Sequence, residues 1–329
     1  WWVASDGDNG NEGSEENPFA DIATAADVAF DGNMIKIRQG TYNFTRSVTV
    51  NEKSLTIIGV DGYENTIIDH NQLGNHFQLA NNSADIMVIR ISGLSLINGS
   101  TDHVAGSIYS YQVDSLFITN CNIANNIANN NQNVNLGGGA IHGYYSRLFI
   151  QDSQFIDNHV FGPGGAIYMQ GATEWHKLLV DNSSFIGNEV HRLNDGYSLS
   201  GGAINSSVPI VISNSIFYNN KIVNQNGSNN QWSRGGAIAV HDNEHTGEWF
   251  SKIENSKFID NILEVGDNNN FLNGAALFLG GPTLVQNNVF AQNKIQFNSG
   301  GNSGEGAAIF ADDGGVNISI VNNTLFNNT

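Results

Sequence analysis

Short apolar runs separated by polar turns recur along the chain, and they predict β-strands. In the middle of the chain these runs are three residues long and partly β-branched, as at 148–150, 178–180 and 210–212. Runs of this length and composition favour buried strands over helices. The same pattern predicts the first strands at 34–37, 48–50, 55–58, 66–68 and 87–91.

Two motifs repeat in step with these runs. Gly-Gly-Ala-Ile, or a close variant, begins at Gly138, Gly164, Gly201, Gly235, Gly274 and Gly306, with a degenerate copy at Ala105. Asn-Ser-x-Phe-x-x-Asn, or a close variant, has its Phe position at Ile123, Phe155, Phe185, Phe217, Phe258, Phe290 and Leu325. These positions are 32, 30, 32, 41, 32 and 35 residues apart. A period of this length predicts a solenoid of stacked units.

Stacking is required because one unit of two or three short strands cannot bury its own apolar face. Neighbouring units would pair in parallel, about 4.8 Å apart. The Phe positions would then form an internal aromatic column, and Cys121, Ser153, Ser183, Ser215 and Ser256 a column of small residues. The two Asn columns would lie at bends, and the Gly pair would supply positive φ values or close backbone approach. We therefore predict an all-β parallel β-helix of about ten or eleven coils.

The N-terminal segment predicts a short helix that closes one end of the β-helix. Asn17 is the expected N-cap, Pro18 the first helical residue, and Asp21 an acidic residue in the first turn. We expect one domain over 1–329, with a cap at 1–33, irregular first coils at 34–104 and regular coils at 105–329. Because a repeat motif reaches Thr329 without a capping segment, we also expect the native protein to continue beyond it.

The paired motifs over 105–329 resemble the repeats of polymorphic outer-membrane proteins, the β-helical passengers of autotransporter adhesins. Gly-Thr-Tyr at 40–42, Ser-Leu-Thr-Ile-Ile-Gly at 54–59 and Asn-Thr-Ile-Ile-Asp at 65–69 are similar to the first coils of the pectate-lyase-like superfamily. These resemblances imply a right-handed helix and a secreted or cell-surface protein. They fix no activity, because this superfamily holds lyases, hydrolases, adhesins and structural passengers.

The composition and net charge exclude several classes of binding partner. The 329 residues include 50 Asn, and the formal net charge is −18. Nucleic acids and anionic membrane surfaces require Lys and Arg, so we expect neither as a partner. No apolar run is long enough to span a bilayer. The single Cys excludes an intrachain disulfide framework.

One candidate surface lies between the closing Asn of each unit and the next Gly-Gly. Its loops span 125–136, 191–200, 224–233, 266–273 and 297–305, and they are rich in Asn, Gly and Ser. Stacked loops would form a long polar face that carries Trp232 and Tyr197. This face is either a glycan- or partner-binding surface or a set of solvated loops.

A second candidate edge follows the Gly-Gly-Ala-Ile strand, where two connections separated by one coil are extended. The first contains Glu174, Trp175, His176 and Lys177, and the second contains Asp242, Glu244, His245, Glu248 and Trp249. Trp175 and Trp249 would stack on sugar rings, or would simply cover the core.

The same two connections offer catalytic candidates. Glu174 and Glu248 would suit inverting glycoside hydrolysis, which needs two carboxylates about 6.5–9.5 Å apart. β-Elimination from a uronate needs a base and a positive charge, for which the candidates are His176, Lys177, Arg147 and Tyr144.

Calcium is the expected ion. Asp6, Asp8, Asn11 and Glu12 provide oxygen ligands in a Gly-rich loop that resembles part of an EF-hand loop.

Taken together, the sequence favours a secreted or cell-surface β-helix that acts in adhesion or surface structure and binds an extracellular glycan or a surface protein. The alternative is a polysaccharide lyase or glycoside hydrolase, and a third possibility is a purely structural stalk.

Overall fold

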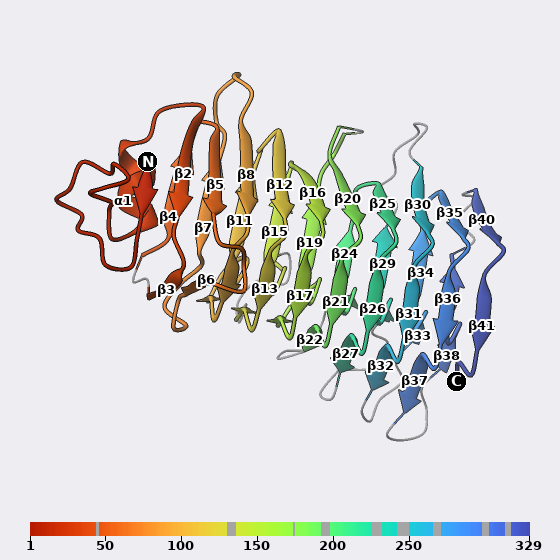
Figure 1. The fold of residues 1–329 in the computed structure, drawn as a ribbon. Coiled ribbons are helices and arrows are strands. Elements are labelled where there is room, and N and C mark those ends of the chain that lie inside the picture. Colours follow the sequence, from red (N-terminus) through yellow and green to blue (C-terminus); the bar gives the residue numbers. More distant parts are fainter. Residues whose placement is uncertain are drawn as a thin grey trace.

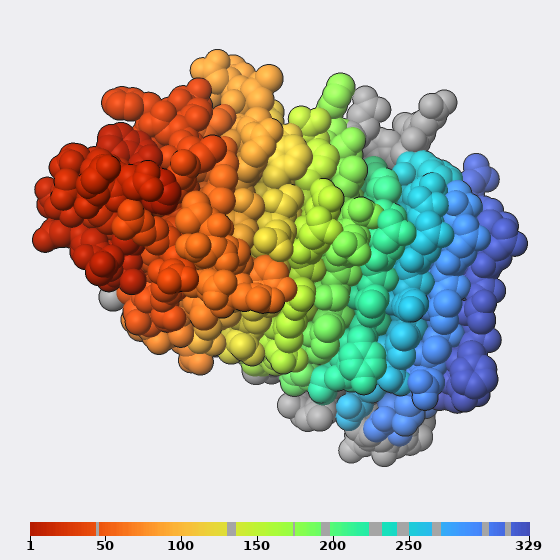
Figure 2. All heavy atoms as spheres, in the orientation of Figure 1, coloured from red at the N-terminus to blue at the C-terminus, as the bar shows by residue number. Residues whose placement is uncertain are grey.

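The chain forms a right-handed parallel β-helix, in which successive coils stack from the N-terminus to the C-terminus (Figure 1). The computed structural model describes residues 1–43, 46–129, 136–173, 175–191, 198–224, 232–241, 250–265, 271–297, 303–312 and 317–329. Within these residues the strands of neighbouring coils pair in parallel, as β12 pairs β16 and β16 pairs β20. In a space-filling view the coils are adjacent coloured bands (Figure 2). The described residues contain no helix of the length and apolarity that crossing a membrane requires.

Three sheets form the walls of the β-helix. Sheet A consists of β1 (Trp2–Val3), β2 (Asn33–Ile37), β5 (Leu55–Gly59), β8 (Val88–Ser92), β12 (Ser115–Thr119), β16 (Arg147–Gln151), β20 (Lys177–Asp181), β25 (Ile210–Ser213), β30 (Ser251–Glu254), β35 (Thr283–Gln286) and β40 (Ile318–Val321). Sheet B consists of β3 (Gly40–Asn43), β6 (Thr66–Asp69), β9 (Ser95–Ile97), β13 (Asn122–Ala124), β17 (Gln154–Ile156), β21 (Ser184–Ile186), β26 (Ile216–Tyr218), β31 (Lys257–Ile259), β36 (Val289–Ala291) and β41 (Thr324–Phe326). Sheet C consists of β4 (Val48–Asn51), β7 (Phe77–Ala80), β11 (Ile108–Tyr111), β15 (Ile141–Tyr144), β19 (Ile167–Gln170), β24 (Ile204–Ser206), β29 (Ile238–His241), β34 (Leu277–Gly280) and β39 (Ile309–Ala311).

Two further sheets follow sheet B in the coils, and most of their strands overlap or adjoin the predicted loops at 125–136, 191–200, 224–233, 266–273 and 297–305. Sheet D consists of β10 (Ser100–Thr101), β14 (Ile127–Ala128), β18 (His159–Val160), β22 (Glu189–His191), β27 (Lys221–Asn224), β32 (Ile262–Val265) and β37 (Lys294–Phe297). Sheet E consists of β23 (Leu199–Ser200), β28 (Trp232–Arg234), β33 (Phe271–Asn273) and β38 (Ser303–Glu305). A regular coil therefore runs through sheets C, A, B and D, and some coils add sheet E.

The expectation of two or three strands and an all-polar loop face was wrong for these segments. Sheets D and E enclose a second apolar cluster, formed by Ala128, Val160, Val190, Leu199, Ile222, Leu263, Leu272 and Ala275. On sheet D, β14, β18, β22, β27 and β32 each contribute one residue to this cluster. The surrounding Asn and Ser residues hid this signal.

The predicted Phe column is confirmed. The rings of Phe155, Phe185, Phe217, Phe258 and Phe290 are fully buried. Successive ring centroids are 4.8–4.9 Å apart and the rings lie within 9° of parallel. This distance equals the spacing of paired strands, so each ring packs directly on the equivalent ring of the next coil.

The closing Asn of each unit forms a buried amide ladder. The members with zero exposure are Asn126, Asn158, Asn188, Asn220, Asn261 and Asn293. In Asn220, Nδ2 donates to Asn261 Oδ1 at 3.0 Å and to Phe185 O at 2.9 Å. Its Oδ1 accepts from the backbone N and from Nδ2 of Asn188, at 3.1 and 2.9 Å. Every polar atom of the buried amide is thus hydrogen-bonded, as burial requires.

The high Asn content also serves the turns. The bend between sheets A and B places one residue per coil at a positive φ of 44–56°, namely Asn120, Asp152, Asn182, Asn214, Asn255, Asn287 and Asn322. Asn and Asp tolerate this left-handed conformation better than other non-glycine residues. In the Gly-Gly motif the two residues have separate roles. Gly164 has a φ of +74°, whereas a Cβ at Gly165 would lie 1.9 Å from Gly202 O of the next coil.

The capping helix forms, but it begins later than predicted. Helix α1 spans Ile22–Val28, and Asp21 is its N-cap, with Oδ1 accepting from Thr24 N at 2.6 Å. Asn17 is not the cap, because the helix begins five residues later, and its Nδ2 donates instead to Glu12 Oε1 at 3.1 Å. Ile22, Ala23, Ala25 and Ala26 of α1 join the main core, so the helix covers the first coil as expected.

We expect Asn220→Asp to destabilise the fold by about 3–5 kcal/mol at pH 7, because it buries an unpaired negative charge against Asn261 Oδ1 and Phe185 O. Burial would raise the pKa of the introduced carboxyl group above its unfolded value of about 3.9. The destabilisation is therefore largest at pH 7 and decreases as the pH falls toward that value. Urea unfolding of variant and parent at pH 7 and pH 5 measures both effects.

The matched control is Asn219→Asp, the same change one residue earlier at an exposed turn position. It should alter the free energy of unfolding by no more than about 0.5 kcal/mol. Equal destabilisation by the two variants would contradict a structural role of the amide ladder.

Candidate functional site

The sequence-predicted site residues divide into two groups. Glu174, Tyr197, Asp242, Glu244, His245, Glu248 and Trp249 lie outside the described residues. The described candidates are Tyr144, Arg147, Trp175, His176, Lys177 and Trp232, together with Asp6, Asp8, Asn11 and Glu12 of the predicted calcium loop. The two extended connections follow β19 and β29, and only β24 lies between these strands in sheet C, as the repeat spacing predicted.

Aromatic rings gather at the edge where sheet C turns into sheet A. Tyr111 and Tyr144 are register partners in neighbouring coils, and their rings stack with centroids 5.7 Å apart. Tyr145 packs against Tyr144 at 4.3 Å, and its ring lies 5.2 Å from that of His176. We call the row of Tyr111, Tyr144, Tyr145 and His176 the tyrosine edge.

Trp175 adjoins the tyrosine edge in sequence and is 67% exposed. It therefore packs little against the core, which leaves its ring accessible to a ligand. This exposure argues against the interpretation in which Trp175 covers the core, and sugar binding by Trp175 stays a prediction.

Tyr145 lies in an unusual backbone conformation, with a φ of 51°. Gln112 and Glu52 have the same conformation at the equivalent position of other coils. The turn itself imposes this φ, and Tyr145 N donates to Gln170 O at 2.8 Å. For a bulky residue the left-handed region costs roughly 1–2 kcal/mol. Since polar residues fill this turn elsewhere, folding does not require an aromatic ring here.

A second row of rings lies on the same strands. His142 is buried, with its ring 4.9 Å from Tyr168 and 5.7 Å from Tyr109. Burial lowers the pKa of His142 to about 4, so the imidazole is neutral at pH 7. Its Nε2 lies 3.0 Å from Gln170 Oε1. This row is a packed support for the outer rings.

The protonation of His176 is defined by its neighbours. Nδ1 accepts from the backbone N–H groups of Ala172 and Thr173, both at 3.3 Å. Burial, and then the positive charge of Arg147, lower the pKa of His176. The neutral imidazole therefore carries its proton on Nε2 and acts as a hydrogen-bond donor there.

Two cations stand beside these rings. Arg147 and Lys177 are register partners at the start of β16 and β20. Arg147 Nε donates to Asp114 O at 2.6 Å, which fixes the guanidinium at the edge. A side-chain hydrogen bond with Tyr145, and then burial, raise the pKa of Tyr144. The edge thus combines aromatic faces, neutral donors and positive charge within three coils.

Trp232, on sheet E, belongs to a different surface. Its ring is 37% exposed and stacks on Phe271 at 4.6 Å. The Arg234 guanidinium lies 4.9 Å from the Trp232 ring centroid and 4.9 Å from that of Phe278. These contacts give Trp232 a packing role within sheet E.

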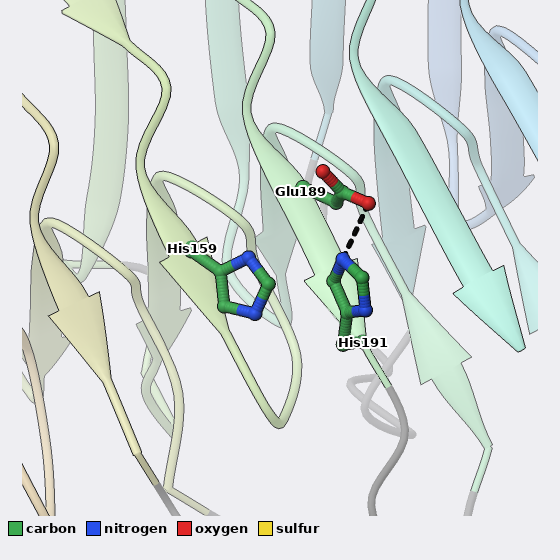
Figure 3. Close-up of side chains that lie close together, drawn as sticks. All are labelled: His159, Glu189 and His191. Atoms are coloured by element: carbon green, nitrogen blue, oxygen red, sulfur yellow. Dashed lines mark ion pairs between the residues drawn. The ribbon is translucent and has the colours of Figure 1, made fainter.

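A cluster of ionisable groups that the sequence did not reveal lies on the outer face of sheet D. It consists of His159, Glu189 and His191 (Figure 3), together with Lys221. His191 Nε2 contacts Glu189 Oε1, and Lys221 Nζ lies 3.2 Å from the same oxygen. Burial, followed by the neighbouring His191, lowers the pKa of His159 to about 4. The alternation of these residues with Val160 and Val190 could have revealed the shared face.

The N-terminal loop predicted to bind calcium uses its polar atoms within the loop. Glu12 Oε1 accepts from Ser14 Oγ and Asn17 Nδ2, and Asp8 Oδ1 accepts from Gly10 N. Asn11 Nδ2 donates to Pro18 O at 3.0 Å. In the part of the chain that the structure describes, the carboxylates of Asp6, Asp8 and Glu12 do not converge as a group of three. Calcium binding stays a prediction.

Comparison with known proteins gives distant similarities. No protein-family model matches the chain. The chain is 23% identical over 312 residues to the metabotropic glutamate receptor-like protein R of Dictyostelium discoideum. That match covers 87% of this chain but only 18% of the relative's length. Among solved structures, the chain is similar to a rhamnogalacturonan lyase with 13% identity and a TM-score of 0.44, over 98% of this chain and 87% of that one.

Proposed function

We propose that this chain is a glycan-binding β-helix of a secreted or cell-surface protein, acting in adhesion or surface structure. The observation that carries the proposal is the tyrosine edge, a row of rings across neighbouring coils that includes Tyr145 at a turn position where folding needs no ring. The partial match to a receptor-like protein supports a place at the cell surface.

The edge suits a sugar chain for physical reasons. The C–H faces of a pyranose pack against aromatic rings, while its hydroxyl groups need hydrogen-bond partners. Tyr111 and Tyr144 supply stacked rings, and His176 Nε2–H supplies a donor. Arg147 and Lys177 add positive charge, so the edge accepts either a neutral glycan or one that carries a uronate.

The second candidate is a polysaccharide lyase. It is favoured by one observation, namely that Tyr144, Arg147, His176 and Lys177, the residues predicted for β-elimination, gather at one edge. The protonation states argue against it. His176 Nδ1 is occupied by backbone donors, and the raised pKa of Tyr144 keeps its hydroxyl protonated at pH 7. Neither group is then a ready base, so binding without cleavage is the better account.

Tyr144→Ala should weaken retention on a bound polysaccharide by about 5–30-fold, which corresponds to one or two kcal/mol of lost stacking. The measurement is affinity electrophoresis of the full chain against a panel of neutral and uronic-acid polysaccharides. The matched control is Tyr218→Ala, which removes a 43% exposed ring from sheet B. The proposal fails if the parent binds no polysaccharide, or if both variants bind as the parent does.

A second assay separates binding from cleavage. The same polysaccharides, incubated with and without Ca²⁺, should yield neither new reducing ends nor the absorbance of unsaturated uronates. Product would establish the lyase or hydrolase alternative. Lys177→Met and Glu248→Gln would then tell whether the first or the second extended connection carries the activity.

A further inference from the structure

The ionisable cluster on sheet D has the composition of a metal site. It offers two imidazole nitrogens and one carboxylate oxygen, a set that transition-metal dications such as Zn²⁺ bind well. One ligand atom from each of His159, Glu189 and His191 lies within 4.8 Å of the other two. Figure 3 shows the three side chains converging from two neighbouring strands.

We propose that His159, Glu189 and His191 bind one divalent transition-metal ion of the Zn²⁺ type. The site lies on sheet D, whereas the tyrosine edge lies where sheet C meets sheet A, so it is independent of the proposed glycan site.

The strands hold these ligands in place. Val160 and Val190 are fully buried, which turns His159, Glu189 and His191 to the outer face of β18 and β22. The backbone N–H of Glu189 donates to Asn158 O at 2.9 Å. Glu189 directly follows Asn188, a member of the amide ladder, so its backbone is held in place. The three ligand atoms already lie within 4.8 Å of one another on paired strands, and rigid strands favour such a site.

Apolar side chains border the cluster along the outer face of sheet D. The register partner of His159 in the preceding coil is Ile127, and that of His191 in the following coil is Val223. One coil farther, Ile262 follows Lys221 and Glu264 follows Val223. The ring of Phe161 lies 4.9 Å from that of His159. Apolar side chains thus border the polar cluster, which reduces competition from water for the metal.

Lys221 gives the competing, metal-free explanation. Its Nζ lies 3.2 Å from Glu189 Oε1, so the cluster can also exist as an ion pair with two adjacent imidazoles. A bound dication would displace this ammonium from Glu189 and would be repelled by it. If the cluster binds metal, removing the Lys221 charge should therefore strengthen that binding. If the cluster is only an ion-pair network, removing the charge should leave the affinity for metal unchanged.

Bound metal would also link two coils. His159 comes from β18 and the other two ligands from β22, which are paired strands of neighbouring coils. A ligand that binds the folded state alone stabilises that state. Zn²⁺ should therefore raise the unfolding temperature of the chain.

The test is calorimetric titration of the full chain, without a histidine tag, with ZnCl₂. The parent should bind one ion, and His159→Gln and His191→Gln should each lower the affinity at least about tenfold. Lys221→Gln should raise it. The matched control is His103→Gln, which changes an exposed imidazole outside the cluster and should leave the affinity unchanged. CaCl₂ in excess should not displace Zn²⁺, because a site with two imidazoles disfavours a hard cation.

Several results would overturn the proposal: no Zn²⁺ binding by the parent, binding that survives both cluster substitutions, or displacement by Ca²⁺. Thermal unfolding without metal serves as the fold control, since each cluster variant should unfold within a few degrees of the metal-free parent. A Zn²⁺-induced increase in unfolding temperature that the cluster variants retain would also count against the site.

Discussion

The in-register stacking of successive coils is the constraint on which the rest of this structure depends. Strands within one coil lie in different sheets, so the backbone groups of each coil must pair with the coils on either side. The Phe column tolerates this spacing, but it does not enforce it, because apolar contacts are not directional. The amide ladder does enforce it. If Asn188 shifted by one residue, Asn220 Oδ1 would lose the hydrogen bonds that it accepts from Asn188 N and Nδ2. Asn188 Nδ2 would also lose its bond to Phe155 O, and these polar atoms would be unpaired in a buried core.

The same constraint explains how much of the fold could be predicted from the sequence. Residues that face the interior recur at each coil, so the Phe, Ser and Asn columns were visible as a period. Sheets D and E were not predicted, because each coil contributes only one or two apolar residues, such as Val190 or Leu199, among many polar ones. The start of α1 was misplaced because Asn17 satisfies a local capping rule, whereas its amide is engaged by Glu12.

The candidate site was predicted only in part, for a related reason. Trp175, His176 and Lys177 were found because an extended connection interrupts the repeat. Tyr111 and Tyr145 belong to no motif, and their proximity depends on the register of sheet C. His159 and Glu189 are 30 residues apart in sequence and become neighbours only through the pairing of β18 with β22. Side chains on the outer face carry no periodic signal of their own, although His159 and Glu189 each directly follow a closing Asn of the repeat.

Function in such a fold must lie where the coils differ, because the interior positions are fixed by stacking. The outer row of sheet C shows this clearly. Tyr111 and Tyr144 are followed in the row by Gln170, and farther along by His241 and Gly280. A binding surface that ran along the whole β-helix would repeat the same side chain in every coil. This row instead changes after two tyrosines. The proposed glycan site at the tyrosine edge is thus confined to a few coils, and the remaining coils hold it in a fixed position.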